Sequence, residues 1–280
     1  MRLGQNAEAK PKSVLQRFSL LHSDFLLLPS FFLTAIRILS VSISENIRHV
    51  RVRVAAAARR SGRDPSAITL MAVSKTFPPD AIHEAYAAGI RVFGENRVQE
   101  FASKIDALRD LPNAEWHLIG HLQSNKAAKA AELFGAVDSL DSAKLAERLN
   151  AAAQAAGKVL PVLIEINIGG ESAKTGVAPR SEELNRLLTA APAWENLAIR
   201  GLMTVPPYSD DPETARPFFR QLRELRDEIA ARNLPAISMD TLSMGMSHDF
   251  EIAIEEGSTC VRVGTAIFGE RQKGLQSSEV

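Results

Sequence analysis

The sequence predicts an α/β fold, a single (β/α)8 barrel of the TIM type, on three observations. Short apolar runs alternate with helical stretches along most of the chain, which is the pattern of parallel strands joined by right-handed crossovers. There are eight such runs, and eight strand–helix units close into a barrel more readily than they form an open sheet. The 280 residues also suit this fold, which needs about 250 residues as one domain.

The first predicted element of the barrel domain is a helix. Ser42 and Glu45 have the spacing of a capping box at a helix start. The apolar residues that follow recur on one helical face: Ile43, Ile47, Val50 and Val54. Gly62 and Pro65 end this helix.

Strands and helices then alternate to the end of the domain. The strands are predicted over Thr69–Val73, Arg91–Phe93, Trp116–Ile119, Ala136–Val137, Pro161–Ile166, Leu197–Leu202, Thr241–Leu242 and Cys260–Val263. The helices between them are predicted over Asp80–Ala88, Arg97–Leu108, Asn125–Phe134, Ala143–Ala156, Ser181–Ala190, Pro212–Ala231 and Asp249–Glu256. The fourth and seventh strands are the shortest of the eight.

One domain is predicted over residues 42–273, because no low-complexity tract or linker interrupts it. Residues 274–280 are expected to form a short C-terminal tail, and residues 1–41 an N-terminal extension.

In the N-terminal extension basic residues precede an apolar run, which is the order of a signal peptide or a short anchor. Pro29 and Arg37 interrupt the run, and it is shorter than the roughly 20 apolar residues of a spanning helix. We therefore expect an unstructured or non-native extension and no membrane partner.

Composition excludes several other classes of protein. Lys plus Arg and Asp plus Glu both number 33, and this balance gives no sign of a nucleic-acid partner. The single cysteine, Cys260, cannot form an internal disulfide and lies in an apolar run, so we expect a buried thiol and a cytoplasmic protein. His117 and His121 have a metal-binding spacing only if they lie on a helix, and this segment begins as a strand, so no metal site is predicted.

The polar residues that follow the strands indicate where a site would lie, because barrels of this class bind ligands at the carboxyl ends of their strands. Lys75 follows the first strand. A lysine there is partly desolvated, which lowers its pKa and makes the neutral amine available for Schiff-base formation. The alternative is a solvated lysine at a strand end.

A second set of residues predicts a phosphate site in the turns after the last two strands. The turn from Ser243 to Ser247 contains glycine and serine and leads into a helix predicted to start near His248. Gly264 and Thr265 form a similar turn after the eighth strand. The alternative role for Ser247 is that of a helix N-cap.

Arg262 is the third candidate, because it stands in an otherwise apolar strand and a buried charge needs a partner. One interpretation is an internal salt bridge to a glutamate. The other is a hydrogen bond to the pyridine nitrogen of pyridoxal 5′-phosphate (PLP). Arginine stays protonated in proteins, so it would keep that nitrogen unprotonated and the cofactor a weak electron sink.

Several segments together resemble the YggS/PROSC family of PLP homeostasis proteins. They are ValSerLysThr (73–76), PheGlyGluAsnArgValGlnGlu (93–100), TrpHisLeuIleGlyHisLeuGlnSerAsnLys (116–126), GlyLeuMetThrValPro (201–206), SerMetGlyMetSer (243–247) and ValArgValGlyThrAlaIlePheGly (261–269). The resemblance covers residues 43–271, in the same order and spacing, and leaves out the N-terminal extension.

The resemblance implies a barrel like the N-terminal domain of alanine racemase, the fold of type III PLP proteins, with Lys75 as the Schiff-base lysine. It implies that Arg262 lies at the pyridine nitrogen and that Asn96, Lys174 and Met203 lie near the cofactor. The phosphate would be bound by Ser243, Ser247, Gly264 and Thr265.

The resemblance implies that the protein binds PLP for vitamin B6 homeostasis and has no robust catalytic activity. It also implies a monomer, with apo PLP-dependent enzymes as possible recipients of the PLP. We expect no enzyme, because related racemases take a second base, a tyrosine, from another domain, and this chain ends soon after the eighth strand. A PLP-dependent racemase or lyase of modest rate is the alternative, with Lys75 as general base. A phosphosugar-type barrel enzyme without PLP is a third reading, which gives Lys75 and Arg262 no joint role.

Overall fold

The computed structural model describes residues 42–171 and 174–270 of the chain. The extension predicted over residues 1–41 and the tail predicted over residues 274–280 lie outside the described residues. So do the last three residues of the predicted domain. Within the described part, no helix combines the length and the apolar composition that a membrane crossing requires.

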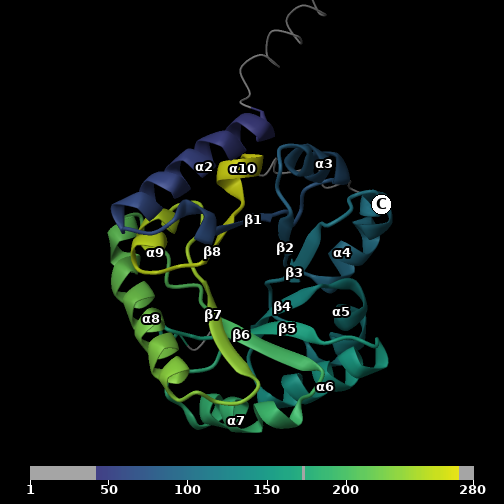
Figure 1. The fold of residues 1–280 in the computed structure, drawn as a ribbon. Helices are drawn as coiled ribbons and strands as arrows, with labels where there is room; N and C mark the ends of the chain where they lie inside the picture. The colour runs from purple at the N-terminus through teal and green to yellow at the C-terminus, as the bar shows by residue number, and fades with distance from the viewer. Residues whose placement is uncertain (1–41, 172–173, 271–280) are drawn as a thin grey trace, which may run out of the picture. The chain divides into compact units, whose positions relative to one another are not determined.

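Eight parallel strands close into a barrel in sequence order, which confirms the predicted fold (Figure 1). The first and last strands also pair, with Thr69 beside Cys260. The strands are β1 (Thr69–Val73), β2 (Val92–Glu95), β3 (Glu115–Leu118), β4 (Ala136–Leu140), β5 (Leu160–Glu165), β6 (Leu197–Met203), β7 (Ile237–Ser243) and β8 (Cys260–Val263).

The fourth and seventh strands are longer than the apolar runs that predicted them. All five residues of β4 are buried, including Asp138 and Ser139. The Asp138 carboxylate lies 3.0 Å from Nδ1 of His117 on β3, and Ser139 donates a hydrogen bond to the Gly120 carbonyl. Polar residues can therefore continue this strand, because each has a hydrogen-bond partner within the protein. The pattern of apolar residues in the sequence does not reveal such partners.

Helices fill the gaps between the strands and surround the barrel (Figure 1). They are α2 (Ile43–Arg60), α3 (Pro79–Ala87), α4 (Val98–Lys104), α5 (Ala127–Leu133), α6 (Ala143–Ala155), α7 (Glu182–Ala190), α8 (Arg216–Ala231), α9 (Phe250–Glu255) and α10 (Thr265–Phe268). Three of the predicted helices are shorter as α-helices, because one end of each is a 3₁₀ turn, a common form of helix terminus: Ile105–Leu108, Ser124–Lys126 and Pro212–Ala215.

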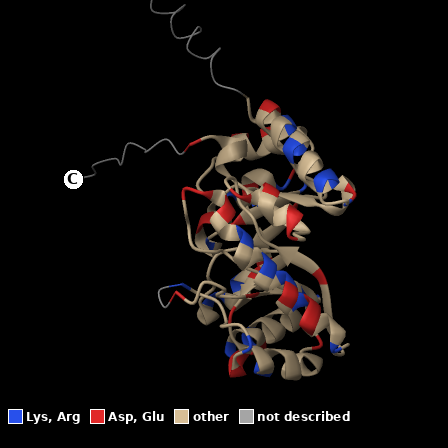
Figure 2. Ribbon diagram, turned by 90° about the vertical axis from the view of Figure 1, so that its left-hand side faces the viewer, with Lys and Arg blue, Asp and Glu red and all other residues tan. Residues whose placement is uncertain are grey.

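The first helix, α2, begins where its sequence predicts. The Ser42 hydroxyl accepts a hydrogen bond from the Glu45 amide at 3.1 Å. The second half of the predicted capping box is absent, because the Glu45 carboxylate pairs with Arg48 at 2.6 Å instead. The helix packs along α9, where Arg53 pairs with Glu251. Figure 2 shows acidic and basic residues interspersed over this side of the barrel domain.

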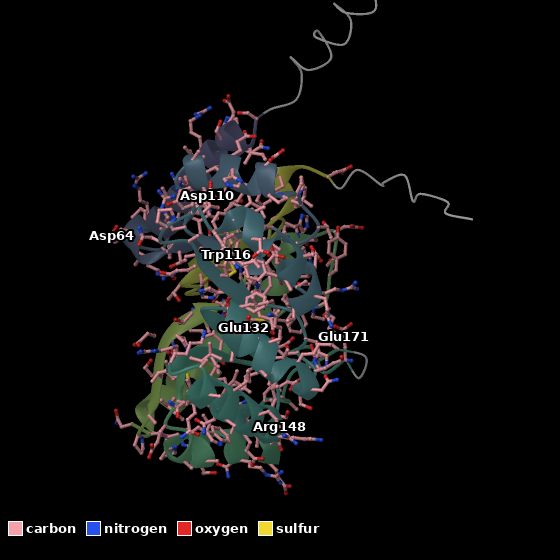
Figure 3. All side chains as sticks on the ribbon, turned by 90° about the vertical axis from the view of Figure 1, so that its right-hand side faces the viewer. Asp64, Asp110, Trp116, Glu132, Arg148 and Glu171 are labelled. Carbon is pink, nitrogen blue, oxygen red and sulfur yellow. The ribbon has the colours of Figure 1, made fainter. Side chains whose placement is uncertain are left out.

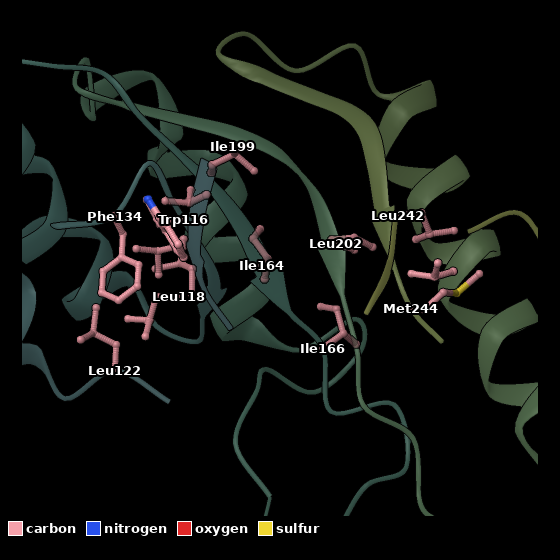
Figure 4. Packing of buried hydrophobic residues seen from close by; sticks show 14 of the residues in the cluster. Trp116, Leu118, Leu122, Phe134, Ile164, Ile166, Ile199, Leu202, Leu242 and Met244 are labelled. Carbon is pink, nitrogen blue, oxygen red and sulfur yellow. The ribbon is translucent and has the colours of Figure 1, made fainter. Parts of the chain in front are cut away.

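The core lies between the barrel and its helices. On one side aromatic rings from strands and helices pack against one another. The ring centroids of Phe93 and Phe101 each lie 4.9 Å from that of Trp116, and the ring centroids of Phe101 and Phe134 lie 4.8 Å apart. Figure 4 shows Trp116 and Phe134 in this packing, with the aliphatic residues of β5 and β6 beyond them. This packing fixes the strands, so the residues at their carboxyl ends have defined positions.

Candidate functional site

A cavity of about 640 Å³ opens at the carboxyl ends of the strands. That volume is within the range of small-molecule sites. Residues that follow β1, β2, β3, β6 and β7 line it, together with residues in and after β5 and β8. In Figure 3, Asp64, which precedes β1, and Glu171, which follows β5, lie on opposite sides of the barrel domain. The cavity is on the Glu171 side, the face at which TIM barrels bind ligands.

Most of the predicted site residues meet at this cavity. The residues that line it are Lys75, Asn96, Lys174, Ser247, Arg262, Gly264 and Thr265. Two do not line it. Met203 is 1% exposed and Ser243 is fully buried, both at the ends of their strands. Any contribution of these two residues to binding would therefore be indirect.

Lys75 lies half-buried in a tight turn directly after β1. The turn is held on both sides of the lysine. Before it, the Ser74 hydroxyl donates to Oε1 of Glu95 at 2.5 Å. After it, Thr76 has a left-handed backbone (φ 67°), an uncommon conformation for threonine, and its amide donates to the carboxylate of Glu100. The backbone at Lys75 is thus held on both sides of the residue.

A buried ion pair lies against this turn. Lys104 of α4 contacts Oε1 of Glu95 through its Nζ at 2.9 Å, and the two side chains are 8% and 0% exposed. The same ammonium donates to the Ser74 carbonyl at 3.1 Å. Burial raises the pKa of Glu95, and the charge of Lys104 opposes that rise. Sequence reasoning missed Lys104, because a lysine within an amphipathic helix normally reaches solvent.

Arg262 crosses the base of the cavity from β8 and is 3% exposed. Its Nη1 donates to the Ser243 hydroxyl and its Nη2 to the Thr204 carbonyl, both at 2.7 Å. The predicted alternative, a salt bridge to a glutamate, is not formed with any described residue, so this charge rests on neutral acceptors. Burial lowers the pKa of Arg262, although nearby acidic groups oppose that shift. Both hydrogen bonds use the terminal nitrogens of the guanidinium group.

The turns after β7 and β8 are joined through Ser247. Its hydroxyl accepts hydrogen bonds from the Gly264 and Ala266 amides at 3.2 and 3.3 Å. The alternative role of Ser247 as the helix N-cap is wrong, because Asp249 holds that position and its carboxylate accepts from the Met246 amide at 2.6 Å. The helix accordingly starts at Phe250, one residue after the start of the predicted helix Asp249–Glu256.

Asn96 lines the cavity directly after β2, and Lys174 lines it from the loop after β5. The Asn96 carbonyl packs closely on Gly120, where a Cβ atom would lie 2.3 Å from that oxygen, so only glycine fits. The Lys174 ammonium pairs with Glu171 and donates to the Pro206 carbonyl at 3.2 Å. It therefore links the loops that follow β5 and β6.

Glu165, the last residue of β5, is a cavity residue that sequence reasoning missed. It is 8% exposed, and burial raises its pKa. Its Oε1 accepts from the Thr175 hydroxyl at 2.9 Å, whereas Oε2 has no hydrogen-bond partner among the described residues. The signal was present, because an acid inside an apolar run is as unusual as the arginine that singled out β8.

The described residues contain no group of three or more His, Cys, Asp or Glu side chains arranged to hold a metal ion. His117 and His121 each lie beside a different carboxylate, Asp138 at 3.0 Å and Asp141 at 3.1 Å. Cys260 is buried, as predicted, and burial raises the pKa of its thiol to about 12.

The class of the protein follows from a family comparison. Residues 43–272 match the family described as alanine racemase, N-terminal domain. Among solved structures, PipY of Synechococcus elongatus, determined with PLP bound, is 38% identical with a TM-score of 0.71. That match covers 81% of this chain and 100% of PipY. This agrees with the predicted fold.

Two curated relatives show which family within this class the chain belongs to. The pyridoxal phosphate homeostasis protein of Aquifex aeolicus is 47% identical over 81% of this chain and 98% of that protein. The pyridoxal phosphate homeostasis protein of Pseudomonas aeruginosa is 45% identical over 85% of this chain and 99% of that protein. The chain therefore belongs to the family of pyridoxal phosphate homeostasis proteins.

Proposed function

We propose that this protein binds PLP in the cavity at the carboxyl ends of the strands and contributes to PLP homeostasis. One observation carries the proposal: Lys75, Arg262 and the joined turns at Ser247 and Gly264 all line the same cavity. An amine, a buried cation and turns with amide donors match the aldehyde, the ring nitrogen and the phosphate of PLP. The names of the curated relatives support the same ligand.

The residues present fit this cofactor. The turn around Lys75 presents its amine at the cavity wall, where it would hold the aldehyde carbon of PLP as a Schiff base. Ser247, Gly264 and Thr265 would hold the phosphate. Arg262 would donate to the pyridine nitrogen, and Asn96 and Lys174 would flank the ligand. When bound, PLP supplies an electrophilic carbonyl carbon, and its capacity as an electron sink is weak beside an arginine.

Met203 and Ser243 are proposed to act through their neighbours. Ser243 accepts a hydrogen bond from Arg262 and thereby orients the guanidinium. Met203 supports the cavity floor by packing. Removing either side chain would then weaken binding indirectly, whereas removing Lys75 would abolish the covalent attachment.

We propose that the protein is not a robust enzyme, and that it carries or buffers PLP as a cytoplasmic monomer. Its single buried thiol suits a reducing compartment.

A racemase or lyase of modest rate is the second candidate. One observation favours it: Tyr208 lines the cavity and is 78% exposed, so it offers a hydroxyl at the rim. Conversion of an amino acid that requires both Lys75 and Tyr208 would support this candidate.

The proposal is tested by visible spectroscopy of the full chain with added PLP. The wild type should develop an absorbance band absent from free PLP, and borohydride should leave PLP covalently attached. Lys75→Ala should lose both signals. Lys129→Ala, which removes a surface lysine from a helix, is the matched control and should keep both. Absence of the band at saturating PLP in the wild type, or its persistence in Lys75→Ala, would contradict the proposal.

A further inference from the structure

Three buried side-chain atoms in the described part of the chain lack a hydrogen-bond partner: Oε2 of Glu95, Oε2 of Glu165 and Oγ of Ser238. A buried polar atom without a partner is costly, so each such atom calls for an explanation. Glu165 differs from the other two residues because it lines the cavity. A ligand in the cavity could supply the missing partner.

The Glu165 side chain is held in place by the chain that follows it. The loop after β5 returns over the strand end, where the Val177 amide donates to the Glu165 carbonyl at 2.8 Å. Gly176 has a φ of 102°, and a Cβ atom at that position would lie 3.2 Å from Cγ of Glu165. With Thr175 bound to Oε1, the carboxyl group has a fixed orientation. The oxygen without a partner, Oε2, therefore belongs to a carboxyl group that the surrounding loop holds in place at the cavity wall.

The surroundings of Glu165 raise its pKa. Burial has the largest effect and raises the pKa, and the nearby carboxylate of Asp141 adds to the rise. The Thr175 hydrogen bond and the charges of Arg262 and His121 oppose it without reversing it. The described residues form no salt bridge with Glu165. A protonated carboxyl group can donate a hydrogen bond through the oxygen that lacks a partner.

We propose that Glu165 is a further cofactor-binding residue, whose Oε2 makes its hydrogen bond to the phenolic oxygen of bound PLP. The inference rests on the proposed PLP binding. The phosphate arm and the phenolic oxygen of PLP lie on opposite sides of the axis from ring nitrogen to aldehyde carbon. With the phosphate at the turns after β7 and β8, the phenolic oxygen points away from those two strands, toward the half of the barrel that contains β3, β4 and β5.

The test compares Glu165→Leu, which keeps the volume but removes the hydrogen bond, with Glu165→Gln, which keeps a donor. We expect PLP to bind Glu165→Leu about 10-fold more weakly, with a shifted visible band. Glu165→Gln should stay within about 3-fold of the wild type. Without PLP, the melting temperature of Glu165→Leu should be unchanged or higher, because an unpaired buried oxygen has been removed.

Two controls separate the possible outcomes. Glu132→Leu, at an exposed glutamate (Figure 3), should change neither affinity nor spectrum. Glu165→Met replaces the leucine variant if that variant does not fold. Wild-type affinity and an unshifted band in Glu165→Leu would overturn the inference, as would equal weakening in the leucine and glutamine variants. Failure of the wild type itself to bind PLP would instead overturn the proposed function.

Discussion

Two buried carboxyl groups at strand ends, Glu95 on β2 and Glu165 on β5, have different surroundings. Both have a pKa raised by burial, and both have one oxygen without a described partner. Glu95 is paired with the Lys104 ammonium under the Lys75 turn. Glu165 has only the Thr175 hydroxyl and lines the cavity. The comparison shows that Glu95 has a charged partner within the protein, whereas Glu165 has none among the described residues and lines the cavity.

The largest effect is expected from Lys104→Met, which removes the cation from the β2 end. Glu95 would remain buried without a charged partner, a change that typically costs about 3–5 kcal/mol of unfolding free energy. Urea denaturation measures this loss. Lys129→Met is the matched control, because Lys129 forms a surface ion pair with Glu132 and should change stability by at most about 1 kcal/mol. Equal losses in both variants would show that Glu95 does not depend on Lys104.

A third buried carboxylate, Asp138, extends the comparison, because its partner is a histidine. Burial opposes the charge on His117, but the carboxylates of Asp138 and Glu115 together outweigh burial and raise the pKa of His117 to about 10. A raised histidine pKa adds stability that is complete below about pH 6.5 and is lost as the pH rises to about 10.

We therefore expect the unfolding free energy of the wild type to fall by about 4 kcal/mol between pH 6.5 and pH 10 from the titration of His117. In Asp138→Asn the fall should be clearly smaller, because the neutral amide no longer favours the charged imidazole. Urea denaturation at several pH values tests this. Parallel pH profiles in the two proteins would show that Asp138 does not control His117.

The smallest effect is expected at the β5 end, from Glu165→Gln in the protein without PLP. The pKa of Glu165 is raised in the folded state, so the wild type loses stability as the pH rises above the ordinary value of 4.5. The glutamine variant lacks this ionisation, so its stability should rise relative to that of the wild type as the pH increases. A constant difference between the two proteins from pH 4 to pH 8 would mean that Glu165 ionises normally.

The sequence allowed much of the site to be predicted, because the fold brings strand ends together. Once eight strands were counted, residues after each strand had to meet at one face, and Lys75, Asn96 and Ser247 do line one cavity. Arg262 was found because a charge within an apolar strand is rare. Glu165 has the same rarity, because it is an acid within the apolar run Pro161–Ile166.

Other features could not be predicted, because they depend on contacts distant in the sequence. Lys104 looks like a surface lysine until α4 packs against β2 and buries it on Glu95. Ser247 looks like a helix cap until the turn after β8 supplies two amides to its hydroxyl. Both assignments require knowing which groups lie next to each other across the barrel.

The sequence by itself determined the barrel, its order of elements and the identity of the amine at its mouth, because strand and helix periodicity and strand-end position are local properties. Only the tertiary structure decided how each buried charge is satisfied. Distances between separate strands and helices decide that Glu95 pairs with Lys104 and that one oxygen of Glu165 has no partner among the described residues. Hydrogen bonds and ion pairs act over a few ångströms, and the packed barrel sets those distances.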